Sequence, residues 1–348
     1  MEEWKIYKIG DLFSHFKSGK GIKADEITPN GDYPVFGGNG LRGYTSRYNF
    51  EGDCAIIGRQ GAFCGNVRYF KGKAYMTEHA IIAVANDNNN TRFLAYLLGV
   101  MKLGRFSGQS AQPGLAVSEL AKQLISVPAL SLQNKIASTL SSLDDKIELN
   151  RRINDNLLAQ AQAIYTEIFS INAKPEWKQG YLSDLISVKY GKDHKKLVDG
   201  HYPVYGSGGI MRGVERPLYE KESVLIPRKG SLNNVIYVNE PFWSVDTMFY
   251  TEMKKPNVAK FVYHFVKSKD LASMNAGSAV PSMTTDILNT MEVVIPSSTA
   301  LSQFENIVSP MYLAMQENKR QNEKLSKLRD NLLPKLMSGE IDVSNIRL

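Results

Sequence analysis

Residues 150–157 read Asn150-Arg151-Arg152-Ile153-Asn154-Asp155-Asn156-Leu157, and residues 318–325 read Asn318-Lys319-Arg320-Gln321-Asn322-Glu323-Lys324-Leu325. Both stretches place two asparagines four residues apart around a basic pair and end on a leucine. Each lies within a long run in which the a and d positions of a heptad are mostly apolar, a period typical of long helices. The sequence therefore predicts two long, closely related helices.

Both heptad patterns extend over about five repeats. The a and d positions are occupied by Ile136, Leu140, Leu143, Ile147, Asn150, Asn154, Leu157, Ala161, Ile164 and Ile168 in the first run, and by Phe304, Val308, Met311, Met315, Asn318, Asn322, Leu325, Arg329, Leu332 and Leu336 in the second. An apolar stripe of this kind needs a partner helix, so we expect the two helices to pair with each other as a coiled coil. Buried asparagines in a helix seam favour a single alignment of the two helices. We therefore expect the register to be set by Asn150, Asn154, Asn318 and Asn322. A helix of about 38 residues would be roughly 57 Å long and would act as a spacer.

The residues before each run also form a repeat. Residues 4–5, 33–40, 55–61 and 125–128 match residues 177–178, 202–209, 224–230 and 293–296, and an Arg-Gly pair follows the second match at residues 42–43 and 212–213. Short apolar runs between Gly-rich turns are typical of strands. We therefore predict an α+β protein with an internal pseudo-twofold repeat, in which each β-rich block is followed by one long helix.

Changes of pattern along the chain set the expected boundaries. We place the first block at residues 1–130, its helix at 131–172, the second block at 173–298, and the second helix with a C-terminal tail at 299–348. Pro175 should stop the first helix, and Pro334 should kink the second helix or end it early.

Composition excludes several classes of protein. The chain has 348 residues, 43% hydrophobic and 22% charged, with a net charge of +7, which indicates a globular protein with room for two cores. Its longest apolar stretch, residues 93–101, is far below the roughly 18 residues that span a bilayer. The N-terminal residues lack the features of a secretory signal, so we expect a cytoplasmic protein without a membrane partner.

Signatures of metal binding and catalysis are weak. Cys54 and Cys64 are not spaced as a zinc motif, the five histidines are scattered, and we predict no metal site. Residues 38–43 match G-x-G-x-x-G, but no helix pattern or acidic partner follows, so we reject a dinucleotide site. There is no P-loop and no Pro-Pro pair, and we predict no catalytic residue.

The Gly-rich loops are better interpreted as binding surfaces. Arginine, lysine, asparagine and glutamine are the side chains that reach phosphates and base edges, and glycine permits close backbone approach. The candidate DNA-binding residues are Asn39, Arg42, Arg59, Gln60 and Gln109 in the first block, and Ser207, Arg212, Arg228, Lys229 and Ser278 in the second. For each residue, an ordinary solvated turn is the alternative.

The chain resembles the specificity subunit of a type I restriction-modification system. The resemblance rests on the pattern at residues 146–154, on its copy at residues 318–325, on the Tyr-Pro-Val-aromatic-Gly loops and on the block ends at Pro128 and Pro296. It implies two target recognition domains that each read one half of a split DNA sequence, held apart by an antiparallel coiled coil. It further implies two methyltransferase subunits docked on the helices, with S-adenosylmethionine bound there and not by this chain, and restriction and translocation subunits that join them.

Two other interpretations remain open. A scaffold whose helices join subunits, and whose blocks bind protein or carbohydrate, should show little salt-sensitive affinity for DNA. The recognition subunit of a fused methyltransferase-nuclease system would differ from the first interpretation only in its partner. If the first interpretation holds, the different loop residues of the two blocks predict an asymmetric, bipartite target.

Overall fold

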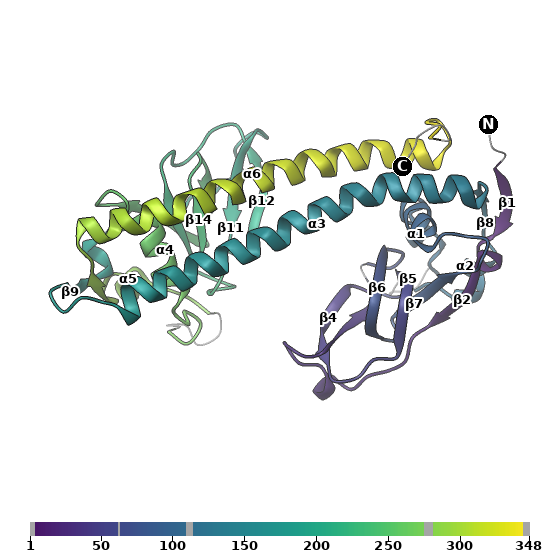
Figure 1. The fold of residues 1–348 in the computed structure, drawn as a ribbon, viewed down its shortest axis with the longest axis horizontal. Coiled ribbons are helices and arrows are strands. Elements are labelled where there is room, and N and C mark those ends of the chain that lie inside the picture. The colour runs from purple at the N-terminus through teal and green to yellow at the C-terminus, as the bar shows by residue number, and fades with distance from the viewer. Residues whose placement is uncertain (1–3, 62, 109–113, 275–280, 344–348) are drawn as a thin grey trace. The chain divides into compact units, whose positions relative to one another are not determined.

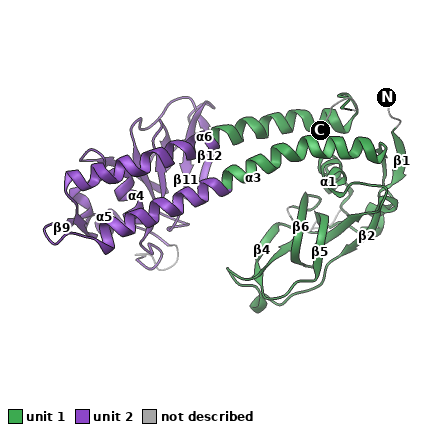
Figure 2. Ribbon diagram, in the orientation of Figure 1, with its two compact units in different colours: residues 1–151, 319–348 green, residues 152–318 purple. Residues whose placement is uncertain are grey.

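A computed structural model describes residues 4–61, 63–108, 114–274 and 281–343 of the chain. These residues form two compact units: unit 1 contains residues 1–151 and 319–348, and unit 2 contains residues 152–318 (Figure 2). Both long helices contribute to both units, so each unit consists of one β-rich block and parts of both helices (Figure 1). The block boundaries expected from the sequence stay a prediction.

Unit 1 is built mainly from β-strands. Its elements before the long helix are β1 (Lys5–Lys8), η1 (Ile9–Leu12), β2 (Phe13–Ser18), η2 (Ala24–Glu26), β3 (Tyr33–Gly37), β4 (Gly40–Thr45), β5 (Phe50–Gly58), β6 (Val67–Met76), β7 (Ala80–Ala85), α1 (Thr91–Val100), η3 (Leu103–Phe106), α2 (Val117–Ala121) and β8 (Leu124–Val127). Six strands form one sheet in the order β2-β7-β5-β6-β3-β4, and β1 pairs with β8. Helix α1 lies between this sheet and the long helix (Figure 1).

Unit 2 repeats this plan. Its elements between the long helices are β9 (Lys178–Tyr181), η5 (Leu182–Asp184), β10 (Ile186–Tyr190), β11 (Tyr202–Gly206), β12 (Gly209–Val214), β13 (Ser223–Pro227), β14 (Ile236–Val238), β15 (Trp243–Ser244), β16 (Met248–Met253), α4 (Ala259–Lys267), α5 (Thr285–Asn289) and β17 (Glu292–Ile295). The strands form sheets in the orders β10-β16-β13-β14 and β12-β11-β15, and β17 pairs with β9. The α+β class and the internal repeat predicted from the sequence are confirmed.

One strand differs between the two units. In unit 1, the ten-residue strand β6 pairs with both β5 and β3. The matching residues of unit 2 form the separate strands β14 and β15, with Pro241 between them. Proline has no backbone N–H to donate to a neighbouring strand, so it interrupts the pairing. The single sheet of unit 1 is therefore divided in unit 2.

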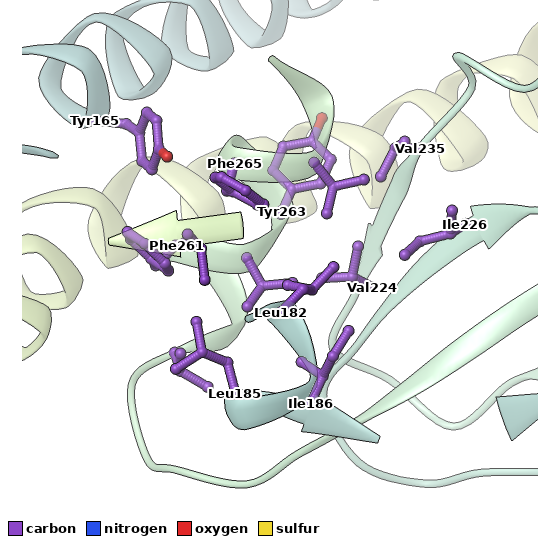
Figure 3. Close-up of a cluster of buried hydrophobic side chains, with 14 of the residues drawn as sticks. Tyr165, Leu182, Leu185, Ile186, Val224, Ile226, Val235, Phe261, Tyr263 and Phe265 are labelled. Atoms are coloured by element: carbon purple, nitrogen blue, oxygen red, sulfur yellow. The ribbon is translucent and has the colours of Figure 1, made fainter. Parts of the chain in front are cut away.

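Each unit has its own hydrophobic core. Phe93 of α1 is completely buried in unit 1, and Phe261 of α4 is 1% exposed in unit 2. The Phe261 ring packs edge-on against Phe169, with 4.9 Å between ring centroids, and Figure 3 shows it among the aliphatic side chains of the same cluster. In both units the core includes side chains from the long helices, such as Leu140 in unit 1 and Phe304 in unit 2. The apolar seams of the helices are thus part of the two cores.

The long helices are α3 (Leu130–Thr166), which ends in the π-helical turn η4 (Glu167–Ile171), and α6 (Ser298–Met337). The sequence predicts that Pro334 kinks the second helix or ends it early. An early end is wrong, because α6 continues to Met337, and a kink stays a prediction. Pro334 lies in the last turn, where its carbonyl still accepts from the Ser338 N–H at 3.0 Å. Its missing N–H removes only the bond to the carbonyl four residues earlier, near the helix end. Pro310 also lies within α6, on its exposed side. Its missing N–H leaves the carbonyl of Asn306, an exposed residue, without its usual helical donor.

No helix in the described ranges is both long and apolar enough to span a lipid bilayer.

In unit 1 the two helices run antiparallel. Asn150 donates from Nδ2 to Oδ1 of Asn322 at 2.8 Å and to Oε1 of Gln321 at 2.7 Å. Six residues closer to the N-terminus of α3, Asp144 forms an ion pair of 2.7 Å with Arg329, which lies further along α6. Asn150 is completely buried, and this alignment, which brings Gln321 and Asn322 opposite to it, satisfies its amide donors.

Unit 2 contains the matching pair. Asn318 donates from Nδ2 to Oδ1 of Asn154 at 2.8 Å, and Asn154 donates to the Met315 carbonyl at 3.1 Å. Tyr165 and Phe304 pack against each other further along, so the helices are antiparallel here as well. The asparagines that the sequence places at matching seam positions therefore form the same type of bond in each unit.

Candidate nucleic-acid interface

The first candidate loop is the tip of a β-hairpin in unit 1. Strands β3 and β4 are joined by the two-residue turn Gly38-Asn39, and Gly40 has a φ of +99°, which favours glycine. Asn39 is exposed at this tip. Arg42 is also exposed and forms no hydrogen bond or ion pair with any described residue. Its side chain crosses Gly37, where an added Cβ would lie 2.7 Å from the Arg42 Cδ. The hairpin tip thus presents an amide and an unpaired guanidinium.

A second loop lies beside this hairpin. Gln60 follows strand β5, and an added Cβ at Gly38 would lie 3.0 Å from the Gln60 carbonyl oxygen. Gln60 is exposed and bridges to Gly114. Arg59 is half-buried and donates from Nη1 to the Glu78 carbonyl at 3.4 Å. The fold therefore brings Asn39 and Gln60 to one edge of unit 1, while Arg59 partly supports the loop.

Unit 2 brings the corresponding loops together. Strands β11 and β12 are joined by Ser207-Gly208, and an added Cβ at Gly230 would lie 2.8 Å from the Ser207 Oγ. Lys229 is exposed and bridges to Ser282. Arg228 donates from Nη1 to the Asp246 carbonyl at 3.0 Å, and its guanidinium lies 5.4 Å from the centre of the Tyr190 ring. Ser207 and Lys229 therefore lie at the edge of unit 2 that corresponds to the edge of unit 1.

Strand register changes one match that the sequence suggests. In unit 1, Val35 pairs with Gly43 and Phe36 pairs with Leu41, so Arg42 is the extra residue of a β-bulge. In unit 2, Val204 pairs with Arg212 and Tyr205 pairs with Ile210, so Met211 is the extra residue. The side chain of Met211 crosses Gly206 as that of Arg42 crosses Gly37, with an Sδ distance of 2.7 Å to an added Cβ. The match of residues 42–43 with residues 212–213 is therefore wrong by one residue: Met211 takes the place of Arg42.

Arg212 has a different environment as a result. A shift of one residue along a strand moves a side chain to the other face. The Arg212 Nη2 donates to the Leu197 carbonyl at 2.5 Å and to the His194 carbonyl at 3.2 Å, and Nη1 forms an ion pair of 3.4 Å with Asp199. These bonds hold the 194–199 loop, and a base contact by Arg212 would have to replace them.

Two candidates cannot be placed. Gln109, with its neighbour Gln112, and Ser278 lie outside the residues that the structure describes. The positions on either side of these gaps are described, and Leu115 donates its N–H to the Arg59 carbonyl at 2.8 Å as Met283 donates to the Arg228 carbonyl at 2.9 Å. Contacts of Gln109 and Ser278 with DNA therefore stay a prediction from the sequence.

The thiols are not suited to nucleophilic chemistry. Burial raises the pKa of Cys54 to about 12, and burial also raises the pKa of Cys64. Both are free cysteines. Because both pKa values are raised, both side chains are protonated thiols at neutral pH. In the described part of the chain, no group of three or more His, Cys, Asp or Glu side chains is placed to hold a metal ion.

Comparison with known proteins adds independent evidence. The family model of the type I restriction modification DNA specificity domain matches residues 1–159 and again residues 174–326. The type I restriction enzyme EcoprrI specificity subunit of Escherichia coli is 38% identical over 146 residues, which are 41% of this chain and 36% of that relative. A putative type I specificity subunit of Mycoplasma genitalium is 26% identical over 366 residues, covering 96% of this chain and 93% of the relative.

A solved structure shows the same fold. The crystal structure of a type I restriction-modification S subunit from M. genitalium matches with a TM-score of 0.62 and 23% sequence identity, and the match covers 96% of each chain. The repeat observed here is thus the repeat of that fold.

Proposed function

Because the chain belongs to the family of type I restriction-modification specificity subunits, which are non-catalytic DNA recognition proteins, we propose that its two units recognise the two halves of an asymmetric, bipartite DNA target. Each unit would place its hairpin tip and the neighbouring loop against one half-site. The paired helices α3 and α6 would set the gap between the half-sites.

The observation that supports this proposal is a difference at matched positions. Unit 1 presents Asn39 and Arg42 on its hairpin, whereas unit 2 presents Gly208 and Met211. Arginine can form two bonds to guanine, and an apolar side chain can contact the methyl group of thymine. Two units with one fold and different exposed side chains are suited to reading two different sequences.

Most of the binding energy should come from phosphates. A chain with a net charge of +7 attracts duplex DNA, and each phosphate contact releases condensed counterions. We therefore expect affinity to fall steeply as salt rises, while a few loop side chains select the bases.

We further propose that two methyltransferase subunits dock on the paired helices. Both helices keep basic side chains exposed beside the asparagine layers: Arg151 and Arg152 on α3, and Lys319 and Arg320 on α6. S-adenosylmethionine would bind to those partners and no cofactor to this chain. Restriction and translocation subunits would join the methyltransferase complex, and the target DNA implies a cytoplasmic location.

The proposal is tested by mapping methylation. The chain is co-expressed with the adenine methyltransferase subunit encoded beside it, and methylated adenines are mapped genome-wide against a host without the chain. A new split motif with a fixed unspecified gap and two different halves is expected. A palindromic motif would refute the asymmetry, and no chain-dependent methylation from a soluble, associated complex would favour a scaffold.

A further inference from the structure

A basic pocket of about 530 Å³ opens in unit 1 beside the hairpin. Three cationic side chains line it: Arg68 from β6, Lys102 from the turn after α1, and Arg105 from η3. All three residues are exposed. The residues that line the pocket include no carboxylate and no aromatic ring. A pocket with three cations and no acidic side chain attracts anions.

These three cations form no ion pair with any described residue. Within the described ranges, their one aromatic contact is that of the Arg105 guanidinium, which lies 4.6 Å from the centre of the Phe106 ring. Lys102 has a φ of +52°, a left-handed conformation that lysine rarely adopts. Lys102 lies three residues before Arg105, and both line the same pocket. Within the described part of the chain, these three side chains therefore do not neutralise a carboxylate.

The pocket adjoins the proposed DNA-reading hairpin. An added Cβ at Gly40 would lie 2.9 Å from the Arg68 Cζ, so the Arg68 guanidinium rests against the hairpin directly after Asn39. Two other lining residues, Gly65 and Gly104, are in close backbone contact, since a Cβ at Gly65 would lie 2.1 Å from the Gly104 nitrogen. A ligand in this pocket would be next to a base-reading loop.

Unit 2 provides an internal comparison. The matched positions carry Ile236, Asp270 and Ser273 in place of Arg68, Lys102 and Arg105. Asn233 stands at the position of Gly65, and its side chain donates to Asp270 at 3.0 Å and accepts from the Ala272 N–H at 3.1 Å. The three matched positions thus carry no cation in unit 2, and the single lysine there, Lys267 at the position of Gly99, donates from Nζ to the Asn233 carbonyl at 3.4 Å. The basic pocket is not required by the fold.

We propose that this pocket binds the phosphodiester backbone of duplex DNA next to the half-site read by unit 1. The inference rests on the proposed function and assigns Arg68, Lys102 and Arg105 as phosphate contacts. A free nucleotide is less well matched, because no aromatic ring lines the pocket to stack on a base. Unit 2 would lack the three matched contacts, so the two units would hold the DNA with unequal electrostatic strength.

The test measures binding of a duplex carrying the mapped methylation motif to the complex of this chain with its methyltransferase partner, at several salt concentrations. The neutral variant carries Arg68→Ile and Arg105→Ser, the residues of unit 2, and Lys102→Asn, because asparagine tolerates a left-handed backbone. The plot of log K against log salt should become less steep by about 0.9 for each phosphate that is no longer neutralised, or up to about 2.7 in all. The preference for the motif over other duplexes should not change, because phosphate contacts carry no sequence information.

A charge-retaining control carries Arg68→Lys, Lys102→Arg and Arg105→Lys, and should keep the wild-type slope. An unchanged slope in the neutral variant would overturn this inference and leave the proposed function intact. An equal change of slope in the control would also overturn it, because charge would not be the cause. If the wild-type complex bound all duplexes equally, the proposed function itself would fail.

Discussion

At the scale of single residues, the bulge positions Arg42 and Met211 are expected to distinguish the two half-sites. Replacing Arg42 by Met should remove a base contact of unit 1 and reduce discrimination at one base pair by about 1–3 kcal/mol. The other half-site should be unaffected. Relative methylation rates on a set of single-base target variants would measure this change.

The reciprocal substitution Met211→Arg is the matched control, and it should alter preference only in the half-site of unit 2. An equal loss of methylation on all sequences after Arg42→Met would instead identify Arg42 as a phosphate contact.

Arg212 is expected to act on stability. Its bonds to the Leu197 and His194 carbonyls and its ion pair with Asp199 hold one loop of unit 2. Arg212→Ala should therefore lower the free energy of unfolding by about 1–3 kcal/mol, because half-buried acceptors lose their donor. Urea denaturation would measure the loss. A variant of wild-type stability that tolerates a new base at one position would restore Arg212 as a base-reading residue.

At the scale of elements, helix α4 depends on a buried histidine. His264 is completely buried, its Nδ1 lies 2.8 Å from the Gln162 Oε1 of α3, and its Nε2 lies 2.9 Å from the Tyr312 hydroxyl of α6. Burial lowers the pKa of His264 to about 4 from its usual 6.5. Between these values the unfolded chain binds the proton and the folded chain does not, so protons favour unfolding.

The stability contributed by neutral His264 should thus be complete above pH 6.5 and decline as pH falls towards 4, with a slope of up to about 1.4 kcal/mol per pH unit. Urea denaturation at a series of pH values would measure it. In His264→Gln this part of the pH dependence should disappear. If the variant kept the wild-type slope, another group would be responsible.

At the scale of the whole molecule, the two cores should respond separately to mutation. Phe93 and Phe261 occupy matched, buried positions in the two units. Removing either ring leaves a cavity, which should destabilise its own unit by about 3–5 kcal/mol. Trp4 lies in unit 1, and Trp177 lies in unit 2, so single-tryptophan variants can report on each unit by fluorescence during denaturation.

Phe261→Ala should shift the Trp177 transition more than the Trp4 transition, and Phe93→Ala should do the reverse. Equal shifts of both reporters in both variants would mean that the continuous helices couple the units into one cooperative unfolding transition.

Much of this molecule follows from sequence alone. The heptads around Asn150 and Asn318 predict two helices that need each other, and the matched Tyr-Pro-Val loops predict two blocks of one fold. Helical and strand periods are local properties, so they can be recognised without knowing the tertiary contacts. The family resemblance rests on the same repeated segments.

Other features were decided only by the tertiary structure. The equivalence of Arg42 with Met211 depends on a bulge in strand pairing, because one residue of register determines which face a side chain occupies. The pocket of Arg68, Lys102 and Arg105 joins a strand, a turn and a short helix, and no spacing in the sequence connects them. The division into units depends likewise on contacts between halves of helices that are far apart in the chain. Local patterns determined the elements of this protein, whereas long-range pairing decided which side chains share a surface.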